Sequence, residues 1–346
     1  MDLASGCLHE GRRPVRKRLC NRGESIVIGV TGGTGFVGQR LVARLALDSP
    51  VRVLAMDMGA APVNNVEYII GEVTSPEVTD RFVQGCTSII HLAGIAHSSL
   101  RTEAEKQRSY KVNVEGTRTV LDTALRRGVQ RLVFVSTTHV YAAHSGLDID
   151  ESAPVAASSY YSFTKIEAEG LVREAAERGM EVVIARPCLI YGPGARFNLD
   201  RMMRGIDRGY YFHMSGRNPM RSFLSVENAA RAMAHLAGRG VSAGTYNLAD
   251  ASPYSLVDFG NELADRMKRR RPRTIPSAVL RTAGAAGSVI QKLGVPLPVS
   301  REAVAKLTSD FTLSTSRLAQ TRFEWDRNVG AVLQQMVDHY LRSMRN

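Results

Sequence analysis

The 346-residue sequence has few cysteines and no long apolar run. Its four cysteines, Cys7, Cys20, Cys86 and Cys188, show no paired spacing. Neither a disulfide framework nor a zinc site is indicated, as is typical of a reducing cytoplasm, and Cys86 and Cys188 are expected to be small buried residues. No segment approaches the roughly 20 apolar residues that span a bilayer, and no hydrophobic stretch follows the basic N-terminus as in a signal peptide. We therefore expect a cytoplasmic protein without an integral membrane segment or bound metal.

The charge balance is one-sided, with 45 Lys and Arg against 33 Asp and Glu and a net charge of +12. Part of this excess lies in two runs, Arg12 to Arg22 and "RMKRRRPR" (Arg266 to Arg273). Aromatic residues do not interleave with them as in a nucleic-acid platform, so we predict solvated surface and no nucleic-acid partner. The excess positive charge would also attract an anionic, phosphate-bearing substrate.

Short apolar runs alternate with helical patterns through the first half of the chain. Such runs are typical of strands buried on both faces of a parallel sheet. They are "SIVIGVT" (25–31), "VRVLAMD" (51–57), "VEYIIGE" (66–72), "TSIIHLA" (87–93), "RLVFVST" (131–137) and "EVVIARP" (181–187). The pattern predicts an α/β fold, a doubly wound and mainly parallel Rossmann-type sheet with a smaller C-terminal substrate-binding lobe.

Domain boundaries follow from this pattern. We expect residues 1–23 to form a disordered basic leader and residues 24–187 to form the Rossmann domain. Turn-rich segments follow, so residues 188–346 are expected to form mainly the substrate-binding lobe. A part of that stretch, about 222–250, is expected to return to the Rossmann domain.

The glycine-rich stretch "VTGGTGFVG" (Val30 to Gly38) follows the first predicted strand, with Gly32, Gly35 and Gly38 three apart. A glycine turn between a strand and a helix presents backbone N–H groups at a positive helix end, where a pyrophosphate fits. Asp57 closes the next predicted strand, where an acidic residue accepts hydrogen bonds from the adenosine ribose and repels a 2′-phosphate. The pattern favours NAD and leaves NADP open.

Tyr161 and Lys165 are four residues apart and so share one helix face. An ammonium beside a phenol, together with a positive nicotinamide ring, lowers the phenol pKa from its usual value near 10 toward ~7. Tyr161 could then exchange a proton with a substrate hydroxyl. A hydroxyl at the carboxyl end of the fifth strand would assist it, and Ser136, Thr137 and Thr138 are all candidates. Tyr160 has Thr164 rather than lysine four residues later.

Six motifs in the same order make the sequence resemble the extended short-chain dehydrogenase/reductases, the NAD-dependent epimerase/dehydratase family. The resemblance runs from about Glu24 to the C-terminus. The motifs are "TGGTGFVG", "HLAG" (91–94), "NVEGT" (113–117), "STTHVY" (136–141), "YYSFTK" ending at Lys165 and "RPCLIYGPG" (186–194). Glycines three apart are this family's own pattern.

The resemblance implies roles for individual residues. The active hydroxyl falls on Thr137, Asn113 matches the asparagine that supports the active site, and Lys165 would also hold the nicotinamide ribose. The implied catalytic set is Asn113, Thr137, Tyr161 and Lys165. The implied cofactor-binding set is Gly32, Gly35, Phe36, Val37, Gly38, Asp57, Glu72 (where Asp is usual), Val73, Leu92, Ala93, Gly94, Tyr161, Lys165 and Pro187. The implied substrate-binding set is Thr137, Thr138, Asn198 and Arg221.

The substrate implied by the resemblance is a nucleotide-diphosphate sugar, with Asn198 and Arg221 at positions that contact the phosphates. Sugar-nucleotide dehydratases carry Asp-Glu after the active threonine, whereas this chain has Thr138 and His139, which disfavours water elimination. Leu189 stands where many epimerases place asparagine, as in bacterial 4-keto-sugar nucleotide reductases. A 4-epimerase and a 4-keto reductase therefore both stay open, and members of the family often form homodimers.

Two further readings stay open. A hydroxysteroid dehydrogenase of the same family would share "GQR" after the glycines and a "VEN" segment like Val226 to Asn228. A non-catalytic dinucleotide-sensing regulator could use the same fold, although such proteins commonly lose the Tyr/Lys pair. His91 is interpreted as structural, and His139 as a packing residue rather than a metal ligand, since no second ligand lies at workable spacing.

Overall fold

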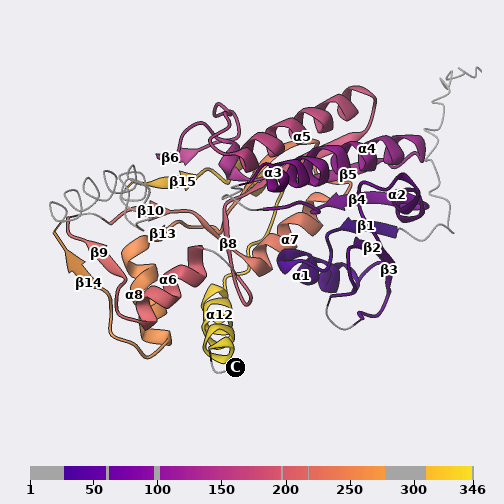
Figure 1. Cartoon of the computed structure of the whole chain (residues 1–346). Helices are drawn as coiled ribbons and strands as arrows, with labels where there is room; N and C mark the ends of the chain where they lie inside the picture. Colours follow the sequence, from indigo (N-terminus) through magenta and orange to yellow (C-terminus); the bar gives the residue numbers. More distant parts are fainter. Residues whose placement is uncertain are drawn as a thin grey trace, which may run out of the picture.

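A computed structural model describes residues 27–59, 62–96, 102–195, 198–216, 218–276 and 309–344. The predicted leader, residues 1–23, lies outside these ranges. The dominant element is a sheet of seven strands, all paired in parallel (Figure 1). Its order is β3 (Val66–Ile70), β2 (Val51–Ala55), β1 (Val27–Thr31), β4 (Cys86–His91), β5 (Arg131–Val135), β7 (Glu181–Pro187) and β12 (Gly244–Leu248).

The direction of winding reverses between β1 and β4. From β1 the chain proceeds outward to β2 and β3, and then returns to place β4, β5, β7 and β12 on the other side of β1. In open sheets of this kind the crevice at the carboxyl ends of the strands beside the reversal is where ligands bind. The predicted doubly wound α/β fold is therefore confirmed.

Each strand contributes to two hydrophobic cores because successive side chains point to opposite faces. Ile90 and Val133 pack in the core beneath α1 (Phe36–Leu45) and α7 (Val226–Leu236). Ile89 and Leu132, one residue earlier in each strand, pack in the core covered by the helices of the opposite face. Those helices are α2 (Pro76–Val83), α4 (Gly116–Arg126) and α5 (Tyr160–Glu177), and Figure 1 shows the two helical layers on either side of the sheet.

Four predicted strands, 51–57, 66–72, 87–93 and 131–137, extend two residues beyond the carboxyl ends of the observed strands. The observed strands end at Ala55, Ile70, His91 and Val135. Apolar residues continue past two of these ends, at Met56 and at Leu92 and Ala93, but at all four the backbone leaves the sheet to form the connecting loops. The residues after each strand therefore line the edge of the sheet that carries the site.

The elements after β7, together with β6, add three smaller sheets and a third core. The four-stranded sheet has the order β13 (Tyr254–Ser255), β10 (Met220–Arg221), β15 (Phe311–Leu313) and β6 (Gly146–Ile149), while β11 (Phe223–Ser225) pairs with β8 (Leu189–Tyr191) and β14 (Arg273–Ile275) with β9 (Phe212–Met214). The third core gathers apolar residues from α6 (Asn198–Asp207), α8 (Leu256–Arg266) and α12 (Val329–Ser343). A short helix, α11 (Ser316–Gln320), follows β15.

A buried carboxylate connects these later elements to the large sheet. Asp250, just past β12, accepts hydrogen bonds from the Ser225 N–H at 3.1 Å, the Asn228 Nδ2 at 2.8 Å and the Tyr191 hydroxyl at 2.9 Å. Burial raises the pKa of Asp250 above its usual value, and the hydrogen bonds from Asn228, Ser225 and Tyr191 act in the opposite direction. The end of β12 is thereby joined to β8, β11 and the first turn of α7.

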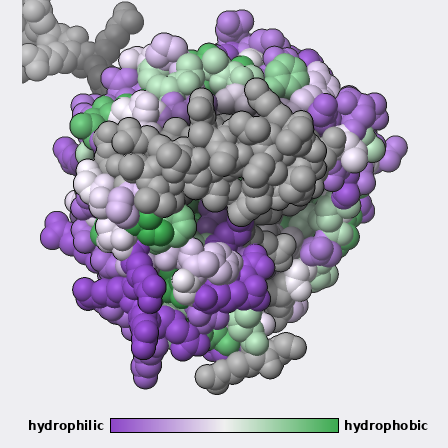
Figure 2. Space-filling view, turned by 60° about the vertical axis from the view of Figure 1, so that its left-hand side comes forward, coloured by the Kyte–Doolittle hydropathy of each residue, from purple (hydrophilic) through white to green (hydrophobic). Residues whose placement is uncertain are grey.

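The basic run Arg266 to Arg273 lies on the surface, where α8 ends and β14 begins. Three of its arginines pair with carboxylates, namely Arg266 with Glu262, Arg269 with Asp207 and Arg271 with Asp265. Figure 2, which turns this side of the molecule forward, shows a largely hydrophilic surface. Within the described ranges no helix is long and apolar enough to cross a membrane, and Cys86 and Cys188 are buried as expected.

A buried ion pair connects α5 to the large sheet. Arg186, on β7, donates from Nε to Glu169 Oε1 at 3.0 Å and from Nη2 to Glu169 Oε2 at 2.7 Å. Ser136 also donates to Glu169 Oε1 at 2.6 Å, so the carboxylate joins α5 to the ends of β5 and β7. Burial raises the pKa of Glu169, but the hydrogen bonds and charge of Arg186 outweigh it, so the net pKa lies below its usual value.

Replacing Glu169 by glutamine should destabilise the protein strongly. The variant leaves the Arg186 guanidinium buried without a counter-charge, which costs about 3 kcal/mol or more of unfolding free energy. Urea denaturation followed by circular dichroism measures the loss. Glu174→Gln, an exposed position on the same helix, is the matched control, and similar unfolding free energies for the two variants would contradict the role given to the pair.

Candidate active site

The glycine-rich turn between β1 and α1 is packed too tightly for side chains. A Cβ atom on Gly38 would lie 2.3 Å from the Gly32 carbonyl oxygen, and one on Gly32 would lie 2.9 Å from the Ala93 nitrogen. Gly32 also has φ +70°, a left-handed conformation that glycine adopts without strain. The turn ends at Gly35, which caps α1 without a side-chain hydrogen bond, so backbone N–H groups form the helix start.

This turn fits a dinucleotide pyrophosphate. A helix N-terminus with its backbone uncovered by side chains offers donors and a positive dipole end to an anion. Leu92, Ala93 and Gly94 follow β4 directly across from it, and the Ala93 N–H donates to the Thr31 hydroxyl at 3.1 Å. Phe36 and Val37 begin α1 and are partly buried, and a Cβ on Gly194 would lie 3.8 Å from the Phe36 ring, so the loop after β8 passes close to the helix start.

Asp57 and Glu72 lie at the carboxyl ends of the next two strands. Asp57 follows β2, is exposed, and accepts a hydrogen bond from the Gly59 N–H at 2.9 Å. A Cβ on Gly59 would meet Thr34 of the glycine turn at 2.8 Å, so the segment carrying Asp57 packs against that turn. Glu72, also exposed, accepts from the Thr74 hydroxyl at 3.0 Å. Both carboxylates are therefore accessible at the edge where an adenosine would lie.

Two other predicted cofactor residues are buried. Val73 packs in the core beneath α4, where a Cβ on Gly116 would come within 2.5 Å of its side chain. Pro187 ends β7 and is also buried. Only their backbone groups are thus placed to contact a ligand.

The three hydroxyls after β5 point to different partners. Ser136 donates to the buried Glu169 beneath the site. Thr137 hydrogen-bonds with the Tyr161 phenol and accepts from the His139 N–H at 3.3 Å. Thr138, also buried, begins the 3₁₀ turn η2 (Thr138–Val140). Among the hydroxyls that residue chemistry left open, Thr137 is the one beside Tyr161.

Tyr161 and Lys165 lie on one face of α5, near the carboxyl end of β5. The Lys165 Nζ donates to the Val135 carbonyl at 2.8 Å and lies 4.8 Å from the centre of the Phe134 ring. Burial lowers the pKa of Lys165 to about 8, although the charge of Glu169 acts in the opposite direction. Lys165 is thus a desolvated cation within the site.

The state of Tyr161 differs from the simple expectation of a lowered pKa. Burial raises the pKa of Tyr161 to about 12, and the hydrogen bond from Thr137 opposes this only in part. The Lys165 ammonium is occupied by the Val135 carbonyl. In the protein alone Tyr161 is therefore a phenol at neutral pH, a proton donor rather than a base.

Asn113 joins α5 to the loop after β4. Its Oδ1 accepts from the Ile95 N–H at 2.7 Å, and its Nδ2 donates to the Thr164 hydroxyl at 3.0 Å. Asn113 lies within η1 (Lys111–Glu115), a π-helical turn between α3 (Glu103–Tyr110) and α4. A Cβ on Gly94 would meet Asn113 Oδ1 at 3.2 Å and Lys165 Nζ at 3.4 Å, so the predicted cofactor and catalytic residues converge here.

The predicted substrate residues lie in the later elements. Asn198 is exposed at the start of α6. Arg221, on β10, is half-buried, and its guanidinium lies 6.0 Å from the centre of the Phe311 ring. Burial lowers the pKa of Arg221, while the Asp310 carboxylate acts in the opposite direction. Arg221 is a partly desolvated cation, as a phosphate-binding side chain would be.

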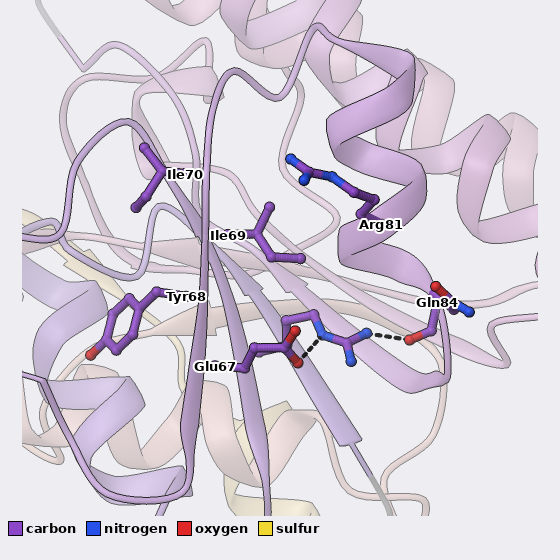
Figure 3. Close-up of a pocket in the computed structure, with 7 residues that line it drawn as sticks. Glu67, Tyr68, Ile69, Ile70, Arg81 and Gln84 are labelled. Atoms are coloured by element: carbon purple, nitrogen blue, oxygen red, sulfur yellow. Dashed lines mark hydrogen bonds and ion pairs between the residues drawn. The ribbon is translucent and has the colours of Figure 1, made fainter.

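A surface hollow lies elsewhere, along the edge strand β3 and the end of α2 (Figure 3). Its lining contains none of the predicted site residues. Arg52, one of its residues, donates to the Glu67 carboxylate at 2.7 Å and to the Gln84 carbonyl, and thereby joins β2 to β3 and to the end of α2. Arg52 therefore has a structural role at this edge of the sheet.

The fold and the site together define a short-chain dehydrogenase/reductase, because the glycine turn, the Tyr161–Lys165 helix face and Thr137 meet at the reversal of the sheet. The chain belongs to the NAD dependent epimerase/dehydratase family, whose sequence model matches residues 28–249. Its cofactor is NAD, as the family is NAD-dependent.

Characterised relatives act on different substrates. A 4-hydroxy-2-methyl-3-oxo-4-farnesyl-3,4-dihydroquinoline-1-oxide ketoreductase of Stigmatella aurantiaca is 31% identical, over 83% of this chain and 88% of that protein. A 3 beta-hydroxysteroid dehydrogenase/Delta 5-->4-isomerase of Mycobacterium tuberculosis is 30% identical over 70% of each chain. A UDP-glucose 4-epimerase of Vibrio cholerae is 33% identical over 58% of this chain and 62% of that protein.

Solved structures show the same fold. A short-chain dehydrogenase/reductase superfamily protein of Agrobacterium tumefaciens, crystallised with NAD, superposes with a TM-score of 0.71 at 21% identity. The match covers 92% of this chain and 98% of that one.

Several residues that shape the site carry no signal that sequence reasoning used. Glu169 follows Lys165 by four residues, so Tyr161, Lys165 and Glu169 form one stripe along α5. That spacing could have identified Glu169, since a carboxylate on a buried helix face needs a partner. Its partner, Arg186, stands in the recognised "RPCLIYGPG" motif but is brought to Glu169 only by the packing of β7 against α5.

Replacing Gly38 by alanine should abolish tight NAD binding. The new methyl group would lie 2.3 Å from the Gly32 carbonyl, so the turn must shift away from the position that receives a pyrophosphate. We expect the NADH dissociation constant, measured by fluorescence titration, to rise at least about tenfold. Gly170→Ala is the matched control, because a Cβ there meets nothing within 4 Å. An unchanged affinity in the Gly38 variant would argue against the site.

Replacing Lys165 by methionine should stabilise the cofactor-free protein at neutral pH. With a pKa of about 8 when folded and about 10.4 when unfolded, the charged lysine costs up to about 3 kcal/mol below pH 8. Between these pH values the unfolded chain binds more protons, so wild-type stability rises with pH and the advantage of the variant shrinks.

Urea denaturation of both proteins at pH 7 and at about pH 10 tests this prediction. Lys106→Met, at a partly exposed position where the ammonium keeps contact with water, serves as control. A Lys165 variant that is no more stable than the wild type at pH 7 would show that the ammonium is not desolvated.

Proposed function

We propose that the protein transfers hydride between its nicotinamide cofactor and a secondary alcohol or ketone carbon of the substrate, with Tyr161 as acid/base. The observation that carries this proposal is the position of the partly buried Tyr161, hydrogen-bonded to Thr137 and one helical turn from Lys165. NAD, when bound, supplies the hydride chemistry. The residues to hold it are the glycine turn (Gly32, Gly35, Gly38), Asp57 and Lys165.

The proton is handled by Tyr161. As a phenol it donates a proton to a ketone oxygen being reduced, and as a phenolate it accepts one from an alcohol being oxidised. Thr137 hydrogen-bonds to the same oxygen and fixes its position. Lys165 stabilises the phenolate if its ammonium leaves the Val135 carbonyl, since an adjacent positive charge lowers a phenol pKa.

The first candidate substrate is a nucleotide-diphosphate sugar, reacting at C4. A half-buried Arg221 on β10 and the exposed Asn198 at the start of α6 suit a diphosphate, because a partly desolvated guanidinium binds phosphate oxygens bidentately. The similarity to the Vibrio cholerae epimerase supports this substrate class. Reduction of a 4-keto sugar nucleotide and 4-epimerisation both use the same groups, and the homodimer implied by the family resemblance stays a prediction.

The second candidate is an apolar cyclic ketone or hydroxysteroid. The ketoreductase and steroid dehydrogenase matches cover 83% and 70% of this chain, more than the 58% of the epimerase match. Leu189, which is 37% exposed at the start of β8, replaces the polar residue of many epimerases with an apolar side chain. This candidate predicts a substrate that carries no phosphate.

A substrate panel separates the two candidates. Purified protein with NADH is offered a UDP-4-keto-6-deoxyhexose, UDP-glucose is offered to the protein as isolated, and dehydroepiandrosterone is offered with NAD. We expect oxidation of NADH by the keto sugar nucleotide. Formation of UDP-galactose with retained cofactor would identify an epimerase, whereas reaction of the steroid alone would support the second candidate.

Replacing Tyr161 by phenylalanine should remove turnover and leave cofactor binding intact. Loss of the acid/base group lowers kcat by about 100-fold or more, while the dissociation constant of NADH should stay within about twofold. Tyr160→Phe, the neighbouring tyrosine without the lysine partner, is the control and should retain activity. Equal activity of the two variants would refute the assignment. A wild type that binds NADH but reacts with no substrate would favour a dinucleotide-sensing regulator.

A further inference from the structure

His91 lies at the centre of a buried hydrogen-bond chain between the cofactor turn and the catalytic helix. It ends β4 and is fully buried. Its Nδ1 is 2.6 Å from the Thr31 hydroxyl at the end of β1, and its Nε2 is 3.0 Å from the Thr117 hydroxyl on α4. Both ring nitrogens are therefore engaged, one on each side of the imidazole.

The donor and acceptor roles in this chain follow from counting protons. Thr117 donates its single hydroxyl proton to the Asn113 carbonyl, 2.6 Å away, because a carbonyl can only accept. Toward His91 the Thr117 oxygen must then accept, so the proton of the imidazole is on Nε2. In a neutral imidazole Nδ1 accepts, and Thr31, which already accepts from the Ala93 N–H, donates to it.

The surroundings require a neutral imidazole. The ring of His91 lies 5.9 Å from that of Phe134, and the Lys165 ammonium lies over the same Phe134 ring at 4.8 Å. Burial lowers the pKa of His91 to about 3, and the charge of Lys165 acts in the same direction. A proton on Nδ1 would also remove the acceptor that Thr31 needs.

The chain ends at the residue that contacts the catalytic helix. Asn113 lies in the π-helical turn η1, where the Gly116 N–H bonds to Lys111, five residues earlier, and such turns recur at functional sites. The Asn113 carbonyl accepts from the Thr117 hydroxyl, and the Asn113 Nδ2 donates to the Thr164 hydroxyl. Thr164 in turn donates to the Tyr161 carbonyl at 2.9 Å. His91 and Thr117 thus act on Tyr161 through Asn113.

We propose that His91 and Thr117 are positioning residues, with His91 as the Nε2–H tautomer. Their hydrogen bonds connect the π-helical turn η1 to the end of β1, and so place Asn113 and Tyr161 relative to the cofactor turn. Neither residue touches the reacting atoms. The inference rests on the proposed function for its kinetic consequence, but the hydrogen-bond arrangement itself does not.

The kinetic test uses a matched pair at Thr117. Thr117→Val keeps the shape of the side chain and removes the hydroxyl, whereas Thr117→Ser keeps the hydroxyl. We expect kcat for the reactive member of the substrate panel to fall at least about tenfold in the valine variant and to stay within about twofold in the serine variant. The NADH dissociation constant should change less than about twofold in both. A merely structural role predicts a lower unfolding midpoint with normal kcat, and that result would overturn the proposal.

A spectroscopic test needs no substrate. In protein labelled with ¹⁵N-histidine, the nitrogen shifts at neutral pH should show His91 as the neutral Nε2–H tautomer. The Nε2 proton should remain protected from exchange in Thr117→Ser and become exchangeable in Thr117→Val. An Nδ1–H or doubly protonated ring in the wild type would overturn the proposal. If no panel substrate reacts, the proposed function fails by itself, and this spectrum still decides the arrangement around His91.

Discussion

The buried ion pair between Glu169 and Arg186 is the interaction on which the catalytic geometry depends. Two charges removed from water are tolerated only when each satisfies the other, so the pair fixes α5 against β7 within narrow limits. Tyr161 and Lys165 precede Glu169 by two turns and one turn of the same helix. The pair that orients α5 at Glu169 therefore also orients Tyr161 and Lys165. Ser136, bonded to the same carboxylate, fixes the start of the loop that places Thr137 beside Tyr161.

The cofactor-binding half of the site depends on close packing rather than on charge. The glycine turn is packed so tightly that a side chain at Gly38 would collide with the backbone of the turn itself, and one at Gly32 with the backbone just after β4. That closeness uncovers the backbone groups that a pyrophosphate needs. Gly94, in the loop after β4, lies next to Asn113 and Lys165, so this loop lies between the cofactor turn and the helix that carries Lys165.

In the protein without its cofactor, the electrostatics of the site favour a neutral, protonated Tyr161. Desolvation raises the pKa of Tyr161 and lowers that of Lys165, so the phenol keeps its proton and the lysine charge is held with little help from water. Both shifts oppose the formation of a phenolate. The positive charge that favours a phenolate must therefore come from rearrangement of Lys165 or from the bound cofactor, and the acid/base group is set by the complex rather than by the tyrosine alone.

How much was accessible from the sequence depends on the range of the interaction involved. Short continuous apolar runs, a glycine turn and a Tyr–Lys pair four residues apart are local patterns. They predicted the doubly wound sheet and indicated Tyr161 as the candidate acid/base group. Local patterns could not choose among Ser136, Thr137 and Thr138, because three successive residues differ only in where the loop turns them. Family resemblance implied Thr137, and in the structure Thr137 is the one of the three that hydrogen-bonds with Tyr161.

The sequence by itself determined the order of the strands and helices of the large sheet, since continuous apolar runs and the steric freedom of glycine act within a few residues. The tertiary structure decided what those elements hold together. Glu169 pairs with Arg186, His91 hydrogen-bonds with Thr31 and Thr117, and Asp250 accepts a hydrogen bond from Tyr191. All of these contacts join residues distant in sequence. Such contacts depend on which strands are neighbours, and buried polar groups find their partners only after the sheet has been assembled.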